Sequence, residues 1–287
     1  MIIIRMNGGL GNQMFQYAFY EYIKKNNDEM YVDVEGYKTY YAHNGYELNR
    51  VFNIDVPIAS VKQLKSVSIN KDSLLSKVIR KVFKVELSRQ SEFSEKLLNM
   101  MVVNDKISQD IYFDGYWQNS KYVSDVEEIL RKKFVFRNVI GNKNIELLDM
   151  IKNSNSISIH IRRGDYLSEP GLFDVCNIAY YCNAIMEIKK QIGEKLKFFV
   201  FSDDPEWCRR NMSMITNETY IDWNKKEDSW IDMYLMSQCK HNIIANSSFS
   251  WWGAWLNENK EKIVVMPKNW RNDIYYRNLN NEKWITL

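Results

Sequence analysis

Apolar and polar residues follow two periods along the second half of this chain. Short β-branched or aromatic runs predict strands, and stretches with helical spacing or polar loops separate them. The predicted strands are 156–161, 197–201, 219–222, 242–245 and 262–266, and the predicted helices are 178–192, 227–238 and a Trp-rich stretch after 246–248. Strands that alternate with helices build a parallel sheet covered on both faces. The second half is therefore predicted to be a doubly wound α/β domain.

The first half opens with a similar unit. Residues 2–5 form an apolar run that predicts a buried strand, residues 12–25 have helical spacing, and residues 30–34 predict a second strand. The later predictions are an irregular region over 36–56, small helices without chemistry over 60–103, a short strand and loop over 112–119, and a helix over 120–134. Polar segments between 135 and 156 predict a boundary near 150, which gives an α/β domain over 1–150 and another over 151–287.

Composition changes this picture little. A chain of 287 residues with 45% hydrophobic and 26% charged residues is typical of a globular enzyme with two small domains. The net charge of +3 is too small to predict nucleic-acid binding, but it is compatible with an anionic ligand or weak attraction to an anionic membrane surface. The amino terminus has no signal-peptide pattern, and no apolar run is long enough to span a bilayer. We expect a cytoplasmic protein, with a peripheral position at the inner membrane surface as a further expectation.

Residues that bind metals are sparse. The four cysteines contain no C-x-x-C pair, the three histidines no H-E-x-x-H motif, and the aspartates no D-x-D spacing. Asp203 and Asp204 are adjacent rather than spaced by two. We therefore expect neither a metal site nor a cofactor.

Candidate chemistry gathers where the predicted strands of the second half end. Four polar loops, 162–165, 202–204, 222–224 and 246–248, each follow a strand. Ligands of open α/β sheets bind beyond these carboxyl ends. Arg162 and Arg163 end the first of these strands, and a guanidinium can donate two parallel hydrogen bonds to phosphate oxygens. The pair predicts an oxyanion clamp; the alternative is a solvated charge cluster in a turn.

Ser247 and Ser248 stand at the start of the Trp-rich helix. Their hydroxyl and backbone N–H groups could hold a phosphate, although simple N-capping is the alternative. Because Arg162 and Arg163 end another strand of the same predicted sheet, two anion-binding loops would share one edge. The combination predicts a diphosphate ligand held without a metal ion.

A glycine-rich loop links the first predicted strand to the first predicted helix. Gly9 and Gly11 allow the backbone to approach a ligand, and a helix amino terminus attracts anions. The alternative is a dinucleotide-binding unit with Asp33 at the end of the second strand. Met14 replaces the third glycine of that motif, which weakens the alternative.

Three segments carry a family resemblance. Residues 160–166, HIRRGDY, resemble the H-x-R-R-x-D motif of the α1,2-, α1,6- and protein O-fucosyltransferases. Residues 8–18, GGLGNQMFQYA, resemble the amino-terminal signature of the α1,2-fucosyltransferases of glycosyltransferase family 11. Residues 239–256, CKHNIIANSSFSWWGAWL, resemble the carboxy-terminal signature of that family. The three occur in family order over nearly the whole chain, so the chain is identified as a member.

The resemblance implies two Rossmann-like domains in a GT-B-like arrangement and an inverting transferase that needs no metal. It would move L-fucose from GDP-β-L-fucose to the 2-OH of a terminal β-galactoside of a surface polysaccharide or oligosaccharide. The first domain would hold this acceptor and the second the GDP-sugar. An NAD-dependent oxidoreductase using the glycine-rich loop and a non-catalytic glycan-binding protein remain as alternatives.

The resemblance also implies roles for single residues. Arg162 would neutralise charge on the β-phosphate as the glycosidic bond breaks, while Arg163 and Asp165 orient it and Asn12 closes over the donor. Asp165 is a candidate base, and the departing phosphate is another. The expected donor-binding residues are His160, Arg163, Asp203, Ser247, Ser248, Phe249, Gly9 and Gly11. Asp203 would hold the ribose or base, or else cap a helix at Pro205. Trp251, Trp252 and Trp255 are expected to pack the helix on the sheet.

Overall fold

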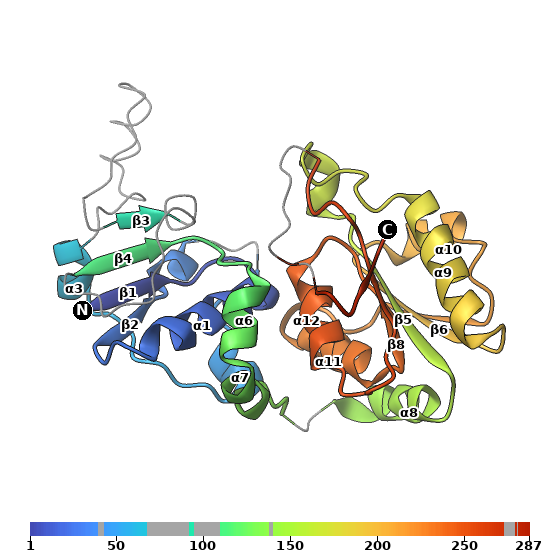
Figure 1. Cartoon of the computed structure of the whole chain (residues 1–287), viewed down its shortest axis with the longest axis horizontal. Coiled ribbons are helices and arrows are strands. Elements are labelled where there is room, and N and C mark those ends of the chain that lie inside the picture. Colours follow the sequence, from blue (N-terminus) through green and yellow to red (C-terminus); the bar gives the residue numbers. More distant parts are fainter. Residues whose placement is uncertain (40–42, 68–91, 95–109, 138–139, 273–278, 280) are drawn as a thin grey trace. The chain divides into compact units, whose positions relative to one another are not determined.

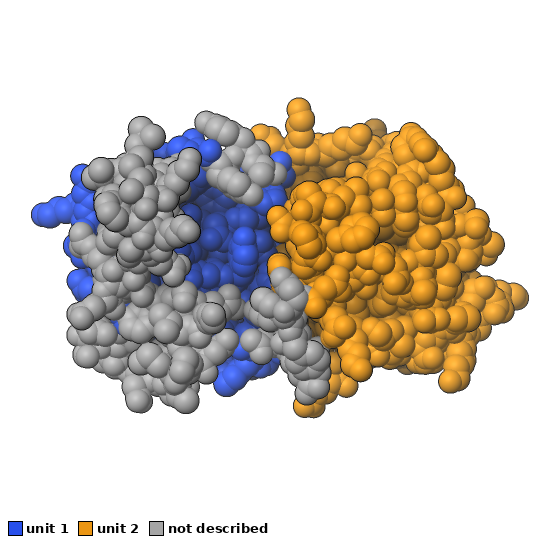
Figure 2. Space-filling view, turned by 90° about the horizontal axis from the view of Figure 1, so that it is seen from above, with its two compact units in different colours: residues 1–135 blue, residues 136–287 orange. Residues whose placement is uncertain are grey.

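The computed structural model describes residues 1–39, 43–67, 92–94, 110–137, 140–272, 279 and 281–287. The chain forms two compact units, 1–135 and 136–287, which are coloured separately in Figure 2. The boundary lies before the predicted position near 150, because helix α8 (Gly141–Lys152) packs on α11 (Trp230–Gln238) of the second unit.

The first unit is built on a parallel sheet with the strand order β2-β1-β4-β3. Its strands are β1 (Ile2–Arg5), β2 (Met30–Asp33), β3 (Glu92–Ser94) and β4 (Ile111–Asp114). Its helices are α1 (Leu10–Lys24), the 3₁₀ helix η1 (Glu35–Lys38), α2 (Leu48–Phe52), α3 (Val61–Val67), α6 (Ser120–Asp125) and α7 (Glu127–Lys133).

Three predictions for the first unit need correction. Strand β3 lies in the region predicted to be helical, because pairing with β4 supplies a partner that local pattern does not reveal. The rest of 68–103 lies outside the described residues. The supposedly irregular region 36–56 contains η1 and α2. The predicted helix over 120–134 is interrupted at Val126, whose φ of −125° is not helical.

Aromatic packing holds α1 on the sheet of the first unit. Phe19 stacks on Trp117 with 4.2 Å between ring centroids, and Phe113 meets both rings edge-on. All three side chains are buried. Because aromatic pairs in these geometries add to the free energy of area burial, this cluster fixes how α1 and its preceding loop sit on the strand ends.

The second unit is built on a six-stranded parallel sheet with the order β10-β9-β8-β5-β6-β7, which confirms the predicted doubly wound fold. Its strands are β5 (Ser156–Ile161), β6 (Lys197–Ser202), β7 (Glu218–Ile221), β8 (His241–Ile243), β9 (Val264–Met266) and β10 (Ile285–Thr286). Strand β10 was not predicted, since two residues give no periodicity. The remaining helices are η2 (Asp165–Ser168), α9 (Ile178–Ile192), α10 (Pro205–Asn211), η3 (Lys226–Asp228) and α12 (Ser248–Leu256).

Helices α9 and α10 cover one face of this sheet, and α11 and α12 cover the other (Figure 1). Helix α12 is buried along its length, and Trp251, Trp252 and Trp255 are at most 6% exposed, which confirms their packing role. Gly253 allows α12 to approach α11, because a Cβ atom there would lie 3.2 Å from the Cβ of Met236.

Each sheet has a topological switch point where the chain reverses its direction across the sheet. In the second unit it lies between β5 and β8, since the chain runs from β5 to β6 and β7 and then returns to β8. In the first unit it lies between β1 and β4. Ligands of open α/β sheets bind in the crevice beyond such points. The loop of Arg162 and that of Ser247 therefore flank the switch point of the second unit.

Candidate functional site

Arg162 is held between two carboxylates immediately after β5. Its Nη2 lies 2.8 Å from Oδ1 of Asp165, and its Nη1 lies 3.1 Å from Oδ2 of Asp203. The Arg162 side chain is only 30% exposed. Two ion pairs from different loops fix the guanidinium plane before any ligand arrives, which is the preorganisation that an anion site needs. The structure thus brings Asp165 to Arg162 as predicted.

Asp203 joins the ends of β5 and β6, and its contact with the ribose or base remains a prediction. Besides its ion pair with Arg162, its Oδ1 accepts a hydrogen bond from the Arg163 backbone N–H at 2.9 Å. It therefore ties the end of β6 to the end of β5. Gly164 makes the approach possible, because a Cβ atom there would lie 2.6 Å from the Asp203 Oδ2. Asp204, and not Asp203, caps α10, where its Oδ1 accepts from the Trp207 N–H at 3.1 Å.

The side chain of Arg163 makes a separate set of contacts. Its Nε lies 3.3 Å from Oδ2 of Asp204, and the centre of its guanidinium lies 3.7 Å from the Trp207 ring centroid. Asp204 and Trp207 hold its guanidinium, so only the backbone N–H of Arg163, which bonds to Asp203, is linked to the predicted orienting of Arg162. The guanidinium groups of the two adjacent arginines therefore have different partners.

The loop after β8 is tied to the loop after β5. Tyr166 donates a hydrogen bond from its hydroxyl to the Asn246 carbonyl at 3.0 Å. Ser247 occupies the N-cap position of α12 but makes no side-chain capping hydrogen bond, and its side chain lies near the Tyr166 hydroxyl. Burial is the largest influence on the Tyr166 hydroxyl and raises its pKa to about 12. The two predicted anion-binding loops are thus adjacent, and simple capping does not account for Ser247.

His160 offers a polar atom that the described part of the chain leaves unpaired. It is 6% exposed near the end of β5, and its Nδ1 has no hydrogen-bond partner among the described residues. Its ring lies 5.8 Å from that of Phe249, centroid to centroid. Burial, and then the charge of Arg162, lower the pKa of His160 to about 3. The imidazole is therefore neutral at physiological pH and can bond to a ligand without adding charge.

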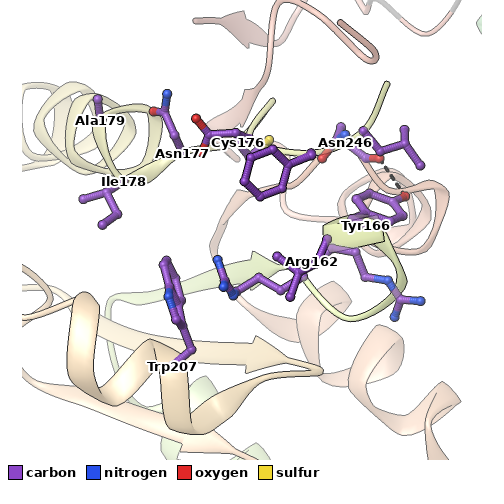
Figure 3. A pocket seen from close by; sticks show the side chains of 13 residues that line it. Arg162, Tyr166, Cys176, Asn177, Ile178, Ala179, Trp207 and Asn246 are labelled. Carbon is purple, nitrogen blue, oxygen red and sulfur yellow. Dashed lines mark hydrogen bonds between the residues drawn. The ribbon is translucent and has the colours of Figure 1, made fainter. Parts of the chain in front are cut away.

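A cavity of about 310 Å³ opens beside Arg162 and Arg163 (Figure 3). It is lined by the loop over 162–177, the first residues of α9 and Trp207. In Figure 3 Trp207 lies across the opening from Asn177 and Ile178. Because residues of α9 and Trp207 of α10 line it, the cavity lies on the face of the sheet that these helices cover. Ser248 begins a helix of the opposite face.

Asp232 is a candidate to which the sequence argument gave no role. It lies in the first turn of α11, and its Oδ1 accepts a hydrogen bond from Asn224 Nδ2 at 2.8 Å. Burial raises the pKa of Asp232 to about 7, although the bond from Asn224 opposes this shift. Asn224 belongs to the loop that follows β7, so Asp232 meets the same carboxyl edge as Arg162. A carboxyl group with a strongly raised pKa at a ligand-binding edge is a functional candidate. The sequence pattern that could have identified Asp232 is an acidic residue in the first turn of a helix that follows a strand.

The glycine-rich loop of the first unit is held by its own side chains. Gly8 has a φ of +73°, and its carbonyl accepts bonds from the Tyr37 hydroxyl at 2.8 Å and from Gln13 Nε2 at 3.1 Å. Asn12 Oδ1 accepts a bond from Gln118 Nε2 at 2.7 Å. A Cβ atom at Gly9 would lie 3.4 Å from the His43 ring, so this glycine keeps the loop close to 43. Gly11 is buried in the first turn of α1.

Two glutamines of α1 had no predicted role. Gln13 and Gln16 are fully buried. Gln16 accepts from the Asn7 N–H at 3.1 Å, and its Nε2 donates to Asn7 Oδ1 at 2.8 Å and to the Gly115 carbonyl at 2.9 Å. It therefore joins the loops after β1 and β4. The family signature over 8–18 is in this part structural.

Asp33 does not suit the dinucleotide-binding alternative. Its Oδ2 accepts from the Tyr112 hydroxyl at 2.7 Å, and its Oδ1 accepts from the Glu35 N–H at 2.9 Å. Both oxygens that would meet a ribose therefore have partners. Met14, at the third glycine position, is fully buried in α1.

Among the described residues, no three His, Cys, Asp or Glu side chains gather in a group that could hold a metal ion. In the same part of the chain, no helix combines the length and apolar character needed to cross a membrane.

The chain matches the model of glycosyl transferase family 11 over residues 1–287. An α-1,2-colitosyltransferase of Escherichia coli is 36% identical over 100% of this chain and 99% of that protein. The O-antigen biosynthesis glycosyltransferase WbnK of Escherichia coli is 32% identical over 98% of this chain and 99% of that protein. A galactoside α-(1,2)-fucosyltransferase 1 of Saimiri sciureus is 35% identical over only 35% of this chain and 28% of that protein.

Solved structures show the same fold. NodZ α-1,6-fucosyltransferase co-crystallized with GDP aligns with a TM-score of 0.57 and 18% identity over 89% of this chain and 92% of that chain. A structure of fucosyltransferase NodZ from Bradyrhizobium gives a TM-score of 0.56 and 16% identity over 88% and 91%. The predicted fold of two Rossmann-like units in the GT-B-like class is confirmed.

Proposed function

The chain belongs to glycosyl transferase family 11, and from this premise we propose that it is an inverting α1,2-fucosyltransferase. The donor is GDP-β-L-fucose, and the acceptor is the 2-OH of a terminal β-galactoside in a surface polysaccharide or oligosaccharide. Membership of the family leaves the dehydrogenase alternative without support, as does the Asp33 carboxylate, whose two oxygens both accept hydrogen bonds within the chain. A glycan-binding protein without activity would have no use for the Arg162 clamp.

The observation that carries the proposal is Arg162 fixed between Asp165 and Asp203 at the switch point. As the bond between the fucose anomeric carbon and the phosphate oxygen breaks, negative charge develops on the β-phosphate of GDP. A guanidinium already held in place stabilises this charge without reorganisation. Ser247, Ser248 and the amino terminus of α12 lie at the neighbouring strand end and offer further donors to the diphosphate.

Inversion follows from a single displacement. The galactoside 2-OH attacks the anomeric carbon on the face opposite GDP, a new C–O bond forms as the old one breaks, and the hydroxyl proton is transferred to a base. One oxygen of Asp165 binds Arg162, and the side chain is 56% exposed. Asp165 therefore remains a candidate base, and the departing phosphate is the other.

The nucleotide is proposed to meet the remaining residues of this edge. His160 supplies its unpaired Nδ1, and Phe249 supplies a ring beside it. Asp232 offers a carboxylate to the two adjacent N–H donors on the guanine edge, and Arg163 stays with the donor-binding residues. From the first unit, Asn12, Gly9 and Gly11 are proposed to contribute to donor binding. The division of labour, with the acceptor held by the first half and the donor by the second, remains a prediction.

Colitose transfer is a second candidate, because a relative that is similar along the whole chain is an α-1,2-colitosyltransferase. Colitose is fucose without its 3-hydroxyl group. A site that hydrogen-bonds this hydroxyl rejects the deoxy sugar strongly, whereas a site that packs against it does not. Competition between GDP-fucose and GDP-colitose in one reaction therefore decides which donor is preferred.

A thermal-shift screen tests the donor class. GDP and GDP-fucose should raise the melting temperature, while UDP-sugars and NAD should not. A ligand at a hundred times its dissociation constant adds about 2.7 kcal/mol to the free energy of unfolding. Stabilisation by NAD alone would contradict the proposal. Transfer to methyl β-D-galactoside, with an α1,2 linkage in the product, then tests the reaction.

We also propose that turnover needs no metal ion. The carboxylates of Asp203 and Asp204 are both paired with guanidinium groups, so neither is predisposed to bind a cation. Activity should survive excess EDTA. Loss on chelation with recovery on adding Mn²⁺ or Mg²⁺ would show that the leaving group is stabilised differently.

A further inference from the structure

The cavity beside the Arg162 clamp is lined by side chains that binding of the donor does not explain. At about 310 Å³ it is at the small end of small-molecule sites, which span about 300–1,000 Å³. It has room for one sugar ring rather than for a nucleotide. Its walls combine an aromatic ring, a guanidinium and a carboxylate with exposed apolar side chains.

One wall is a rigid platform formed by Trp207 and Arg163. The guanidinium lies 3.7 Å from the ring centroid, and Asp204 holds it through Nε at 3.3 Å while also capping the helix that carries Trp207. The ion pair uses only one of the three guanidinium nitrogens of Arg163. The platform thus offers hydrogen-bond donors beside an apolar ring, and its position is fixed without a ligand.

The rim of the cavity is apolar and unusually exposed. Leu167, Phe173 and Ile178 are 48%, 49% and 39% exposed. Asp174 also lines the cavity, and within the described ranges its carboxylate makes no hydrogen bond or ion pair. Apolar surface beside an unpaired carboxylate matches a pyranose, which has an apolar face of C–H groups and a rim of hydroxyl donors.

The wall toward Ser247 separates the cavity from the loop that is proposed to hold phosphate. Tyr166 and Asn246 form this wall, and the Tyr166 hydroxyl donates a hydrogen bond to the Asn246 carbonyl at 3.0 Å, drawn as a dashed line in Figure 3. The donor diphosphate would lie on the Ser247 side of this bond. A ligand in the cavity would therefore approach the clamp from the side opposite the diphosphate.

We infer that this cavity of the second unit binds the second sugar of the acceptor, the residue to which the terminal galactose is attached, in addition to the acceptor contacts predicted for the first half. The inference rests on the proposed fucosyltransferase function and adds a specificity site to it. The apolar face of that sugar packs on Phe173 and the Trp207 platform, and its hydroxyl groups donate to Asp174. The enzyme therefore distinguishes a disaccharide acceptor from a single galactoside.

Acceptor kinetics at saturating GDP-fucose test this site. Methyl β-D-galactoside is compared with lactose, N-acetyllactosamine and Galβ1-3GlcNAc, and the measured quantity is the ratio of kcat/KM for the best disaccharide to that for the methyl glycoside. The ratio should fall about tenfold in Phe173→Ala and in Asp174→Ala, the lower end of what a shaped pocket discriminates. The kcat/KM for methyl β-D-galactoside and the melting shift with GDP should stay near wild type.

Met186→Ala is the matched control, because Met186 is an exposed apolar residue of α9, at 59%, outside the cavity. An unchanged ratio in both cavity variants would overturn the inference. A rise in the KM for GDP-fucose hydrolysis without acceptor would overturn it as well, by assigning the cavity to the donor sugar. Wild-type protein that binds GDP but transfers to no β-galactoside would instead overturn the proposed function on which the inference rests.

Discussion

The two units place their switch points in the same way and fill them with opposite chemistry. Between β1 and β4 of the first unit, the joining groups beyond the Arg5–Asp114 ion pair are mostly amides, with Gln16 and the Asn12–Gln118 pair bridging the loops. Between β5 and β8 of the second unit, charged groups prevail, with Arg162 held by two carboxylates.

The difference lies in what each edge keeps available. The glutamines of the first edge bond to the chain itself, so they stabilise the loops. The second edge retains hydrogen-bonding capacity, as the unpaired Nδ1 of His160 shows. Topology thus defines where a ligand can bind, while the remaining donors and charges decide which edge performs chemistry. The four predictions below test this division, beginning with the largest expected effect.

Arg162→Lys should cause the largest loss of turnover. Lysine keeps the positive charge but loses the planar fork that Asp165 and Asp203 hold. Removing a donor from a preorganised anion site typically costs about a hundred- to a thousandfold in kcat. The melting temperature without ligand should barely change. Arg210→Lys, at an exposed ion pair with Glu206 on α10, is the control and should keep normal turnover. Near-normal turnover in Arg162→Lys would reduce the clamp to a surface charge cluster.

Asp203→Asn tests whether the brace itself matters. The amide can still accept from the Arg163 N–H but no longer neutralises Arg162. A misplaced guanidinium should lower kcat by about ten- to a hundredfold, in line with the cost of a displacement of about 1 Å. The KM for the acceptor should change less. Equal turnover in wild type and variant would mean that Asp165 alone positions Arg162.

Gln16→Ala, at the carboxyl edge of the first sheet, should lower the stability of the fold rather than turnover. It leaves the Asn7 N–H and the Gly115 carbonyl without their partner. Each unsatisfied buried group costs about 1–3 kcal/mol, so the free energy of unfolding should fall by at least this amount. Denaturant titration measures it, with Gln191→Ala on the exposed face of α9 as the control. A large loss of kcat at full stability would show that this edge takes part in catalysis after all.

Without a bound nucleotide, Asp232→Asn should have the smallest effect of the four, visible in the pH dependence of stability. Because burial raises the pKa of Asp232 to about 7, the folded protein binds a proton that the unfolded chain has released above its ordinary pKa near 4. Wild-type stability should therefore fall as pH rises from about 4 to about 7. The variant should lack this component when both are unfolded by denaturant at pH 5 and pH 8. Identical slopes would contradict the raised pKa.

Much of the charged edge could be predicted from sequence, because strand ends of a parallel sheet converge whatever their sequence separation. That rule placed the Arg162 loop beside the Ser247 loop. Local patterns also located α9, whose bounds agree with the predicted 178–192. They could not show that Asp203 would brace Arg162, since an ion pair between residues 41 positions apart depends on the register of β5 with β6.

Other features of the fold also depend on contacts that local sequence patterns do not contain. Arg163 and Arg162 are neighbours in sequence, yet the first pairs with Asp204 and the second with Asp203, a distinction that only the loop backbone around Gly164 decides. Strand β3 was missed because its partner β4 supplies the reason for it to be extended. The place of α8 in the second unit depends on its packing on α11, a contact that the amphipathic pattern of α8 does not specify.

The parallel pairing of β1 has a consequence for synthesis on the ribosome. One edge of β1 pairs early with β2, but the other waits for β4, and Arg5 and Asp114 at the strand ends are 109 positions apart. At a translation rate of about 5–20 residues per second, the apolar segment of Ile2, Ile3 and Ile4 presents an open edge for roughly 5–20 s. An unpaired apolar edge is a template for intermolecular strand pairing. We therefore expect chaperone supply and translation speed during this interval to affect how much nascent chain reaches the folded state.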